Sequence, residues 1–303
     1  RLMGPAILGS AAVQINVMVS TNFASIINDP VTGADGPVSW LGYAFRFMQL
    51  PLGLFGVAIA SATLPEISRR ASLGDIDGFR RTLSRSLGMV FLLTIPSSVG
   101  LVVLGRSMIG LIYEGGRFGS YDTRQTALAL SCYAVGLAGY AALKVLAPAF
   151  YALNDARTPM LVSLASILIN FGMAEAMVRS HTLGHAGLAV ATSTVALFNF
   201  AALFWILRNR IGGIHGRALL KSVAEILFAS GVMGLAVLLS SRAVGLWLGA
   251  TRLGRLVDLA VSIPLGAAAF YLVCRLVRVA ELELAAGALL APLAGWVRRQ
   301  RDR

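Results

Sequence analysis

Long apolar stretches alternate along the chain with shorter polar segments that are mostly basic. Eight stretches are each close to the roughly 20 residues that an α-helix needs to cross a bilayer. They cover residues 3–27, 38–63, 84–105, 126–152, 159–178, 186–207, 219–241 and 256–277. The pattern predicts an all-α integral membrane protein with about eight transmembrane helices.

Composition supports this prediction. Of the 303 residues, 57% are hydrophobic and only 13% are charged. A soluble domain has about 45–50% apolar and about 25% charged residues. The apolar excess is too large for a single buried core, so it indicates repeated crossing of a membrane.

The charges predict how the chain is oriented. The net charge is +12, and the basic residues gather between the apolar stretches, above all at 64–83 and 208–218. If residue 1 is cytoplasmic, 17 of the 26 Lys and Arg lie on the cytoplasmic side and 7 on the other. The positive-inside rule therefore places both ends in the cytoplasm. Nucleic acid is not an expected partner, because basic patches interleaved with aromatic residues are absent.

The end of the sequence is apolar but short for a span. Residues 279–296 include Glu281, Glu283 and Pro292, and the basic run RRQRDR follows Trp296. We expect an interfacial helix and a basic tail over 279–303 on the cytoplasmic face. A ninth span is the alternative.

Small residues and prolines recur within the predicted spans. Gly53, Gly56 and Ala60 are spaced to share one face of the second span, which predicts tight helix packing there. Prolines within spans tend to kink helices, as a moving protein needs, although static bundles contain them too. They are Pro51, Pro96, Pro148 and Pro264.

Nothing in the sequence predicts an enzyme. The histidines His181, His185 and His215 all fall in predicted loops, and no phosphate-binding loop or nucleophile motif appears. Cys132 and Cys274 lie far apart in apolar segments, so we interpret them as small packing residues. No metal and no cofactor are expected.

Arg46 is the most informative residue, because it lies inside the second span. It follows Val38 by eight residues, about 12 Å along a helix. A charge at that depth costs about 2.5–3.5 kcal/mol and usually faces a wet cavity or an anionic partner. We expect Arg46 to face a cavity that receives phosphate, for which a guanidinium is well suited. Snorkelling to the outer interface is the alternative.

Lys144 is the second intramembrane cation. It lies about eight residues before the inner end of the fourth span. Snorkelling toward the cytoplasm explains it as well as a cavity does. If Lys144 and Arg46 share one cavity, that cavity prefers anions.

Polar side chains in the first span are candidates to line a water-filled path. They are Gln14, Asn16 and Asn22, with Ser20 and Thr21 beside them. Hydrogen bonding between helices explains them equally well, and the same holds for Asn170 and Asn199.

Four stretches carry a resemblance to a known family. They are LMGPAILGSAAVQIN at 2–16, LPLGLFGVAIASATLPEISRRAS at 50–72, YEGGRFGSYDT at 113–123 and KVLAPAFYALNDARTP at 144–159. In these stretches and their spacing the chain resembles the MviN/MurJ family of lipid II flippases. The second half matches only in its hydropathy pattern.

The resemblance implies the multidrug/oligosaccharidyl-lipid/polysaccharide exporter fold, in which fourteen helices form two lobes around a cationic cavity. This chain looks like helices seven to fourteen, with the first lobe of the same protein as partner. Residues 1–217 then form the six-helix transport lobe, and 218–278 form an extra helix pair with a groove for a lipid tail. Arg46 matches a cavity arginine of the family.

The implied activity moves the undecaprenyl-diphosphate-linked peptidoglycan precursor across the bacterial inner membrane by alternating access. Lipid-linked precursor and membrane lipids are the implied partners. Some family members bind sodium through carboxylates in this lobe. Here Asn170 matches one ligand, but Ala174 is not acidic and the first span has no carboxylate. Sodium coupling is therefore not expected.

Two other functions stay open at this stage. One is another exporter of the same fold that moves polysaccharide-lipid or drugs. A drug exporter would offer cavity carboxylates, whereas the intramembrane charges identified here are Arg46 and Lys144. The other is a non-transporting scaffold of a cell-wall complex, which the absence of a first lobe in this chain motivates.

Overall fold

The computed structural model describes residues 3–283 except 30, 34, 181–182, 215 and 250. In this part of the chain the elements are helices, and two isolated β-bridges occur in loops. In chain order they are α1 (Met3–Ile26), α2 (Asp35–Pro51), the π-helical segment η1 (Leu52–Val57), α3 (Ala58–Ser72), α4 (Ile76–Tyr113), α5 (Ser120–Ala152), α6 (Arg157–Ser180), α7 (Gly184–Arg210), α8 (Gly216–Leu248) and α9 (Arg252–Val277).

The helices confirm the all-α membrane class. Among the described residues, 7 helical segments are long and apolar enough to cross a membrane. They correspond to the second to eighth predicted spans, and α2, η1 and α3 together form one of them. The first predicted span, 3–27, coincides with the 24-residue helix α1, which is not among the seven.

Several helices extend well beyond the predicted spans. The 38 residues of α4 correspond to about 57 Å, against a hydrocarbon core of about 30 Å. The predicted loop 64–83 is wrong, because only Leu73–Asp75 separates α3 from α4. Hydropathy marks where a helix leaves the apolar layer, whereas Glu and Arg are good helix formers and continue the helix beyond it.

The central helix of the bundle is α5, which packs against α2, η1, α3, α4 and α7. Small residues permit this close packing. A side chain added at Gly136 of α5 would meet the backbone of Ser193 in α7, and one at Gly139 would meet the carbonyl of Ala196. Further along α5, toward its C-terminal end, Leu146 and Phe150 belong to the main core, which also includes Phe79, Leu87 and Leu207.

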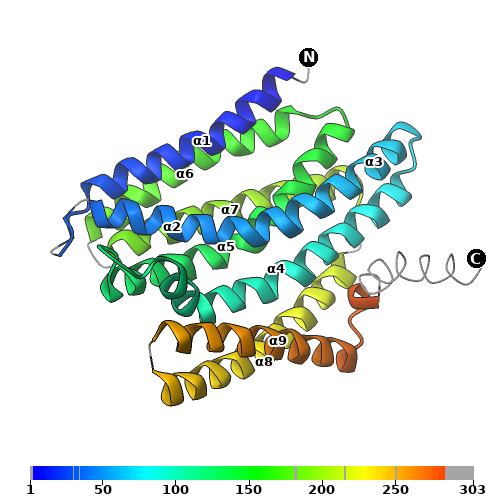
Figure 1. Cartoon of the computed structure of the whole chain (residues 1–303). Coiled ribbons are helices and arrows are strands. Elements are labelled where there is room, and N and C mark those ends of the chain that lie inside the picture. Colours follow the sequence, from blue (N-terminus) through cyan, green and yellow to red (C-terminus); the bar gives the residue numbers. More distant parts are fainter. Residues whose placement is uncertain are drawn as a thin grey trace, which may run out of the picture.

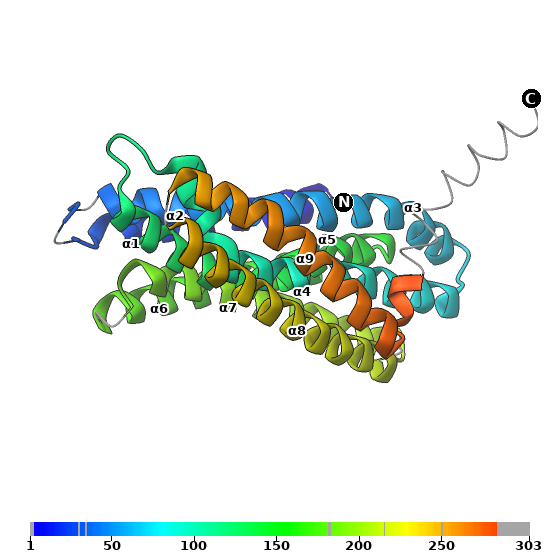
Figure 2. The same cartoon turned by 60° about the horizontal axis from the view of Figure 1, so that its bottom comes forward.

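Helices α8 and α9 pack on each other and on α4, along one side of the bundle (Figure 1; Figure 2). Their buried residues Leu219, Ile226 and Cys274 belong to the same core as Phe79 and Phe150. The helix pair therefore continues the core of the first six predicted spans. Cys274 and Cys132 are both free thiols.

The helix ends fall into two groups (Figure 1). The start of α1, the α3–α4 turn, the α5–α6 and α7–α8 connections and the end of α9 share one end of the bundle, at the right of Figure 1. This is the end that the charge pattern predicts to be cytoplasmic, and its sidedness stays a prediction. The predicted interfacial helix 279–296 lies outside the described residues beyond 283.

Candidate functional site

Arg46 lies on the solvent- or lipid-exposed side of α2. The opposite side of this helix is buried against α5 through Leu41, Ala44, Phe47 and Met48. The guanidinium of Arg46 lies 5.7 Å from the ring centroid of Tyr43, one turn earlier on the helix. None of the ion pairs in the described part of the chain includes Arg46. Its charge is therefore held by a cation–π contact and is free to meet an anion.

A small cavity lies next to Arg46, between α1 and α2. It has a volume of about 180 Å³, and Ser20 and Thr21 of α1, Gly42 of α2, Tyr133 of α5 and Thr192 of α7 help to line it. Arg46 follows Gly42 by one helical turn, so it flanks this cavity without lining it. The wider cavity that the sequence predicts for Arg46 stays a prediction.

Lys144 is exposed on α5. It continues the helix stripe of Tyr133 and Tyr140 toward the inner end, because these positions are separated by seven and four residues. Tyr133 lines the small cavity, and the hydroxyl of Tyr140 donates to the carbonyl of Thr192 at 3.4 Å. Lys144 and Arg46 are thus on the side of the lobe where α1 and α2 meet, but among the described residues the contact of Arg46 is with Tyr43 and not with Lys144.

The three polar candidates of α1 differ in environment. Gln14 and Asn22 are exposed. The amide of Asn16 donates to the hydroxyl of Ser166 in α6 at 3.2 Å, and the backbone carbonyl of Asn16 accepts from Asn170 at 3.2 Å. Asn16 and Asn170 therefore join α1 to α6, which is the interhelical role that the sequence left open.

This contact does not offer a good sodium site. The side-chain oxygens of Asn16 and Asn170 are buried without a hydrogen-bond partner, but neighbouring Ala174 is a fully buried apolar residue. The described residues contain no group of three His, Cys, Asp or Glu that could hold a metal ion. The donors here carry no negative charge, so they fit a sodium ion poorly.

Sequence reasoning missed a buried carboxylate near the start of the last span. Asp258 of α9 is only 4% exposed. Its oxygens accept hydrogen bonds from Ser107 of α4 at 2.5 Å, Ser241 of α8 at 2.9 Å and Ser262 of α9 at 2.9 Å. One side chain thus joins three helices. The predicted span began at residue 256, so Asp258 fell at its end, near the membrane interface. The serines in three apolar stretches were a usable signal for a buried hydrogen-bond acceptor between helices.

The motif at 113–123 forms a polar cluster at the end of the bundle opposite the α3–α4 turn. Asp122 caps α5 by accepting from the amide of Gly119 at 2.8 Å, and it also accepts from the indole of Trp40 in α2 at 2.9 Å. Tyr121 donates to Asp29 in the α1–α2 loop at 2.9 Å. The motif therefore fixes α2 and the preceding loop against α5.

His185 belongs to the same region. The prediction that it lies in a loop is wrong, because it is a buried residue in the first turn of α7. Its Nε2 lies 3.0 Å from the carbonyl of Gln125, and its ring packs edge-on against Trp40. The hydropathy pattern did not show this helix start, because the first residues of α7 precede the apolar stretch that begins at residue 186. His181 and His215 are outside the described residues.

The motif at 144–159 forms the turn between α5 and α6. Asn154 adopts a left-handed conformation with φ of 58°, and Asp155 then accepts from the backbone and hydroxyl of Thr158 at 3.0 and 2.6 Å. Arg210 at the end of α7 pairs with Asp155. Burial opposes ionisation of Asp155, but these bonds hold its pKa below the ordinary value. The turn thus ties the ends of three helices together.

The motif at 50–72 contains the π-helical segment η1, directly after Pro51. Its hydrogen-bond spacing differs from that of an α-helix, so residues three apart no longer share a face. Gly56 is buried and approaches the backbone of Ala141 in α5, whereas nothing lies within 4 Å of a side chain added at Gly53. The prediction that Gly53, Gly56 and Ala60 form one packing face is therefore wrong for Gly53.

Comparison with known proteins assigns this arrangement to a family. The family model described as lipid II flippase MurJ matches residues 1–256. A relative from Vibrio cholerae serotype O1, named probable lipid II flippase MurJ, is 33% identical over 288 residues, which are 94% of this chain and 53% of the relative. A protein of the same name from Rickettsia prowazekii is 35% identical over 202 residues, 67% of this chain and 38% of that protein.

Solved structures agree with the fold. A structure described as lipid II flippase MurJ in an inward closed conformation gives a TM-score of 0.70 at 24% identity, covering 88% of this chain and 52% of that one. An outward-facing multidrug resistance MATE family transporter of the MOP superfamily gives 0.60 at 16% identity, covering 96% of this chain and 70% of that one. At these identities the likeness shows the fold alone.

The chain spans about half the length of the curated relative from Vibrio cholerae and of the solved MurJ structure. Within that span the matched residues include all four motif stretches and Arg46. The chain belongs to the MurJ family of lipid II flippases.

Proposed function

We propose that this chain is the C-terminal transport lobe of a lipid II flippase, acting with a first lobe of the same protein. The observation that carries the proposal is the MurJ family match over residues 1–256. The exposed guanidinium of Arg46 supports it, because a diphosphate is the ligand that such a cation would attract. Arg46 lies eleven residues into α2, about 16 Å along the helix.

The physical task explains why a membrane cation is useful. A lipid-linked diphosphate with a sugar–peptide head cannot cross hydrocarbon unaided, because charged and unpaired polar groups lose their hydration there. In the proposed mechanism Arg46 replaces part of that hydration. Lys144 and the exposed Gln14 and Asn22 of α1 assist it, and rocking of two lobes opens the cavity to each face in turn.

The lipid tail need not enter the cavity. We propose that it stays in the bilayer along the α8–α9 pair, whose exposed side chains Leu246, Leu253 and Leu276 are apolar. The site of action is the bacterial inner membrane, with both ends of the chain in the cytoplasm.

Arg46 provides the test. The intact gene, carrying Arg46→Ala or Arg46→Lys, is expressed in cells depleted of their own flippase, and growth is measured. We expect Arg46→Ala to abolish rescue and Arg46→Lys to restore it partly, because lysine keeps the charge but not the planar fork of donors. Arg179→Ala is the matched control, since this exposed arginine pairs with Glu175 at the end of α6.

Equal rescue by the Arg46→Ala and Arg179→Ala variants, at equal amounts in the membrane, contradicts the role of Arg46. Failure of the unaltered gene to restore growth contradicts the flippase itself. Drug tolerance without rescue identifies instead an exporter of other cargo.

A further inference from the structure

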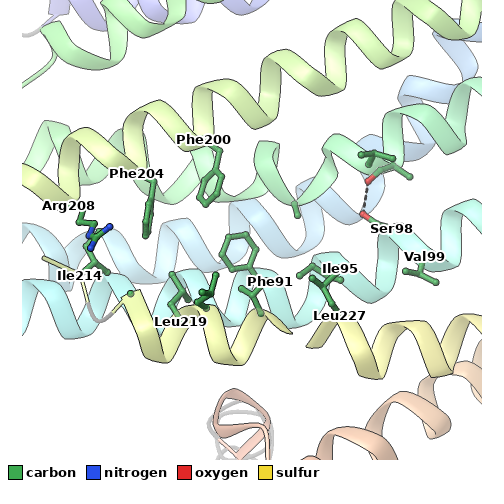
Figure 3. Close-up of a pocket in the computed structure, with 16 residues that line it drawn as sticks. Phe91, Ile95, Ser98, Val99, Phe200, Phe204, Arg208, Ile214, Leu219 and Leu227 are labelled. Atoms are coloured by element: carbon green, nitrogen blue, oxygen red, sulfur yellow. Dashed lines mark hydrogen bonds between the residues drawn. The ribbon is translucent and has the colours of Figure 1, made fainter. Parts of the chain in front are cut away.

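A second, larger hollow lies on the other side of α5. This groove has a volume of about 790 Å³ and is lined by 16 residues of α4, α5, α7, α8 and the α7–α8 connection (Figure 3). Phe91, Phe200, Phe204 and Leu227 form much of its wall. At the end away from Arg208 the hydroxyl of Ser98 donates to the carbonyl of Ala134 at 2.7 Å, so this lining hydroxyl already has an acceptor within the protein (Figure 3).

The length of the groove fits one leaflet of a membrane. On α8 it extends from Gly216 to Leu227, about 16 Å of helix. Half of a hydrocarbon core is about 15 Å. The groove is also open to its side, because the lining residues Leu220, Leu227 and Val135 are exposed by 72%, 54% and 62%. An acyl chain can therefore enter from the bilayer and lie along it.

The mouth of the groove is positively charged. Arg208, at the end of α7, lies at the same end as Ile214 (Figure 3). Its guanidinium lies 5.4 Å from the ring centroid of Trp205, and no carboxylate pairs with it in the described residues, whereas Arg210 pairs with Asp155. The start of α8 at Gly216 adds the partial positive charge of a helix N-terminus. None of the described residues that line the groove is acidic.

The groove is separated from the side of the lobe that bears Arg46. Val135 and Ala138 of α5 line the groove, whereas Tyr133 and Leu137 of the same helix belong to the core shared with α2. A lipid whose diphosphate is at Arg46 would have α5 between its head and this groove. The occupant is therefore a different lipid from the transported one.

We propose that the groove binds an anionic glycerophospholipid, with one acyl chain between α5, α7 and α8 and its headgroup phosphate at Arg208. Trp205, which is 59% exposed, lies at the membrane–water interface beside the headgroup. The bound lipid fills the space between α7 and α8 and so supports the docking of the α8–α9 pair on α4. This inference does not depend on the transport activity.

Fluorescence of Trp205 tests the proposal. The full chain is reconstituted in phosphatidylcholine vesicles that contain a minor fraction of phosphatidylglycerol with brominated acyl chains, which quench an indole on contact. Subtracting the signal of the Trp205→Phe variant isolates Trp205 from the other tryptophans. We expect brominated phosphatidylglycerol to quench Trp205 as if enriched about fivefold over the same fraction of brominated phosphatidylcholine.

Variants separate the charge from the groove. Arg208→Gln should remove the preference for phosphatidylglycerol, and Ala138→Phe should reduce it by filling the groove while the charge remains. Lys221→Gln, at the same end of the bundle, should keep it, because Lys221 is 79% exposed and lies 3.7 Å from Glu225. Equal quenching by the two brominated lipids in the unaltered chain overturns the proposal, as does equal loss in Arg208→Gln and Lys221→Gln.

The same measurement decides between two lipid sources. Undecaprenyl phosphate added in equimolar amount to brominated phosphatidylglycerol should leave the quenching unchanged. If it restores Trp205 fluorescence, the groove belongs to the prenyl chain of the transported lipid and the phospholipid assignment is wrong.

Discussion

Single side chains fix the ends of helices and attach the α8–α9 pair to the rest of the bundle. Asp258 is the clearest case, because three serine hydroxyls from three helices converge on its carboxylate. Glu114, after α4, is another, because its Oε2 accepts from Arg255 of α9 at 2.8 Å and from the Thr123 hydroxyl at 2.8 Å. Both residues attach α9 to the rest of the bundle.

Replacing Asp258 should loosen that attachment. Asp258→Ala leaves the hydroxyls of Ser107 and Ser241 without their acceptor, at a cost of about 2 kcal/mol, whereas Ser262 can still donate to Ser240. Asp258→Asn keeps an acceptor and should cost less. The measurement is thermal unfolding in detergent micelles. Asp77→Ala is the control, because Asp77 is 76% exposed and pairs only with Arg80 of its own helix, so it should change little. Equal effects of the two alanine variants would refute this role.

Glu114 should make unfolding depend on acidity. The Arg255 guanidinium, against partial burial, holds the pKa of Glu114 below its ordinary value of 4.5, and Thr123 helps. A folded-state pKa below the unfolded one contributes stability that is complete above pH 4.5 and is lost as pH falls through the folded-state pKa. The unfolding temperature of the unaltered chain should therefore exceed that of Glu114→Gln at pH 6, and the difference should shrink below pH 4.5. A constant difference across this range argues against the ion pair.

For single residues, the sequence could predict which charged side chains lie within a membrane span, but not what those side chains face. Hydropathy was enough to locate Arg46 and Lys144 inside spans, and both are exposed on this lobe. What such a side chain faces depends on neighbours that are distant in sequence. The burial of Asp258 could not be predicted for the same reason. Its partners Ser107 and Ser241 lie 151 and 17 residues away in the sequence.

Among the elements, η1 combines a change of helix type with a close approach to α5. A side chain at Gly56 would lie 3.3 Å from the Cα of Ala141, and one at Gly53 would meet nothing within 4 Å. We expect Gly56→Leu to lower the stability by about 1–3 kcal/mol through overpacking, and Gly53→Leu to be nearly neutral. Thermal unfolding of the two purified variants measures this. If both variants unfold alike, η1 does not pack on α5 as described.

Element identity was predictable, whereas element length was not. An apolar stretch of about 20 residues is a strong signal, so all eight predicted spans coincide with helices. The helices continue through Glu66, Arg69, Arg80 and Arg81, since charge ends the membrane contact but not the hydrogen-bonded backbone. Pro51 marked a disturbance in the second span, but nothing in the pattern specified a π-helical turn after it.

For the whole molecule, the arrangement follows from the packing of α5 and from the α8–α9 pair on α4. The charge asymmetry predicts which connections face the cytoplasm. In the structure these connections lie together at one end of the bundle, as that prediction requires. The two hollows on opposite sides of α5 could not be predicted from sequence, because their walls come from helices far apart in the chain.

The three-residue turn between α3 and α4 has a consequence for proteolysis. Arg69, Arg70, Arg80, Arg81 and Arg85 all lie in helical backbone. Trypsin needs several residues of extended chain around its cleavage site, which a stiff hairpin does not supply. Limited digestion of reconstituted vesicles should therefore leave α2 to α4 on one fragment in a denaturing gel, despite five adjacent targets. Rapid cutting at these arginines would mean that the hairpin frays in the membrane-bound protein.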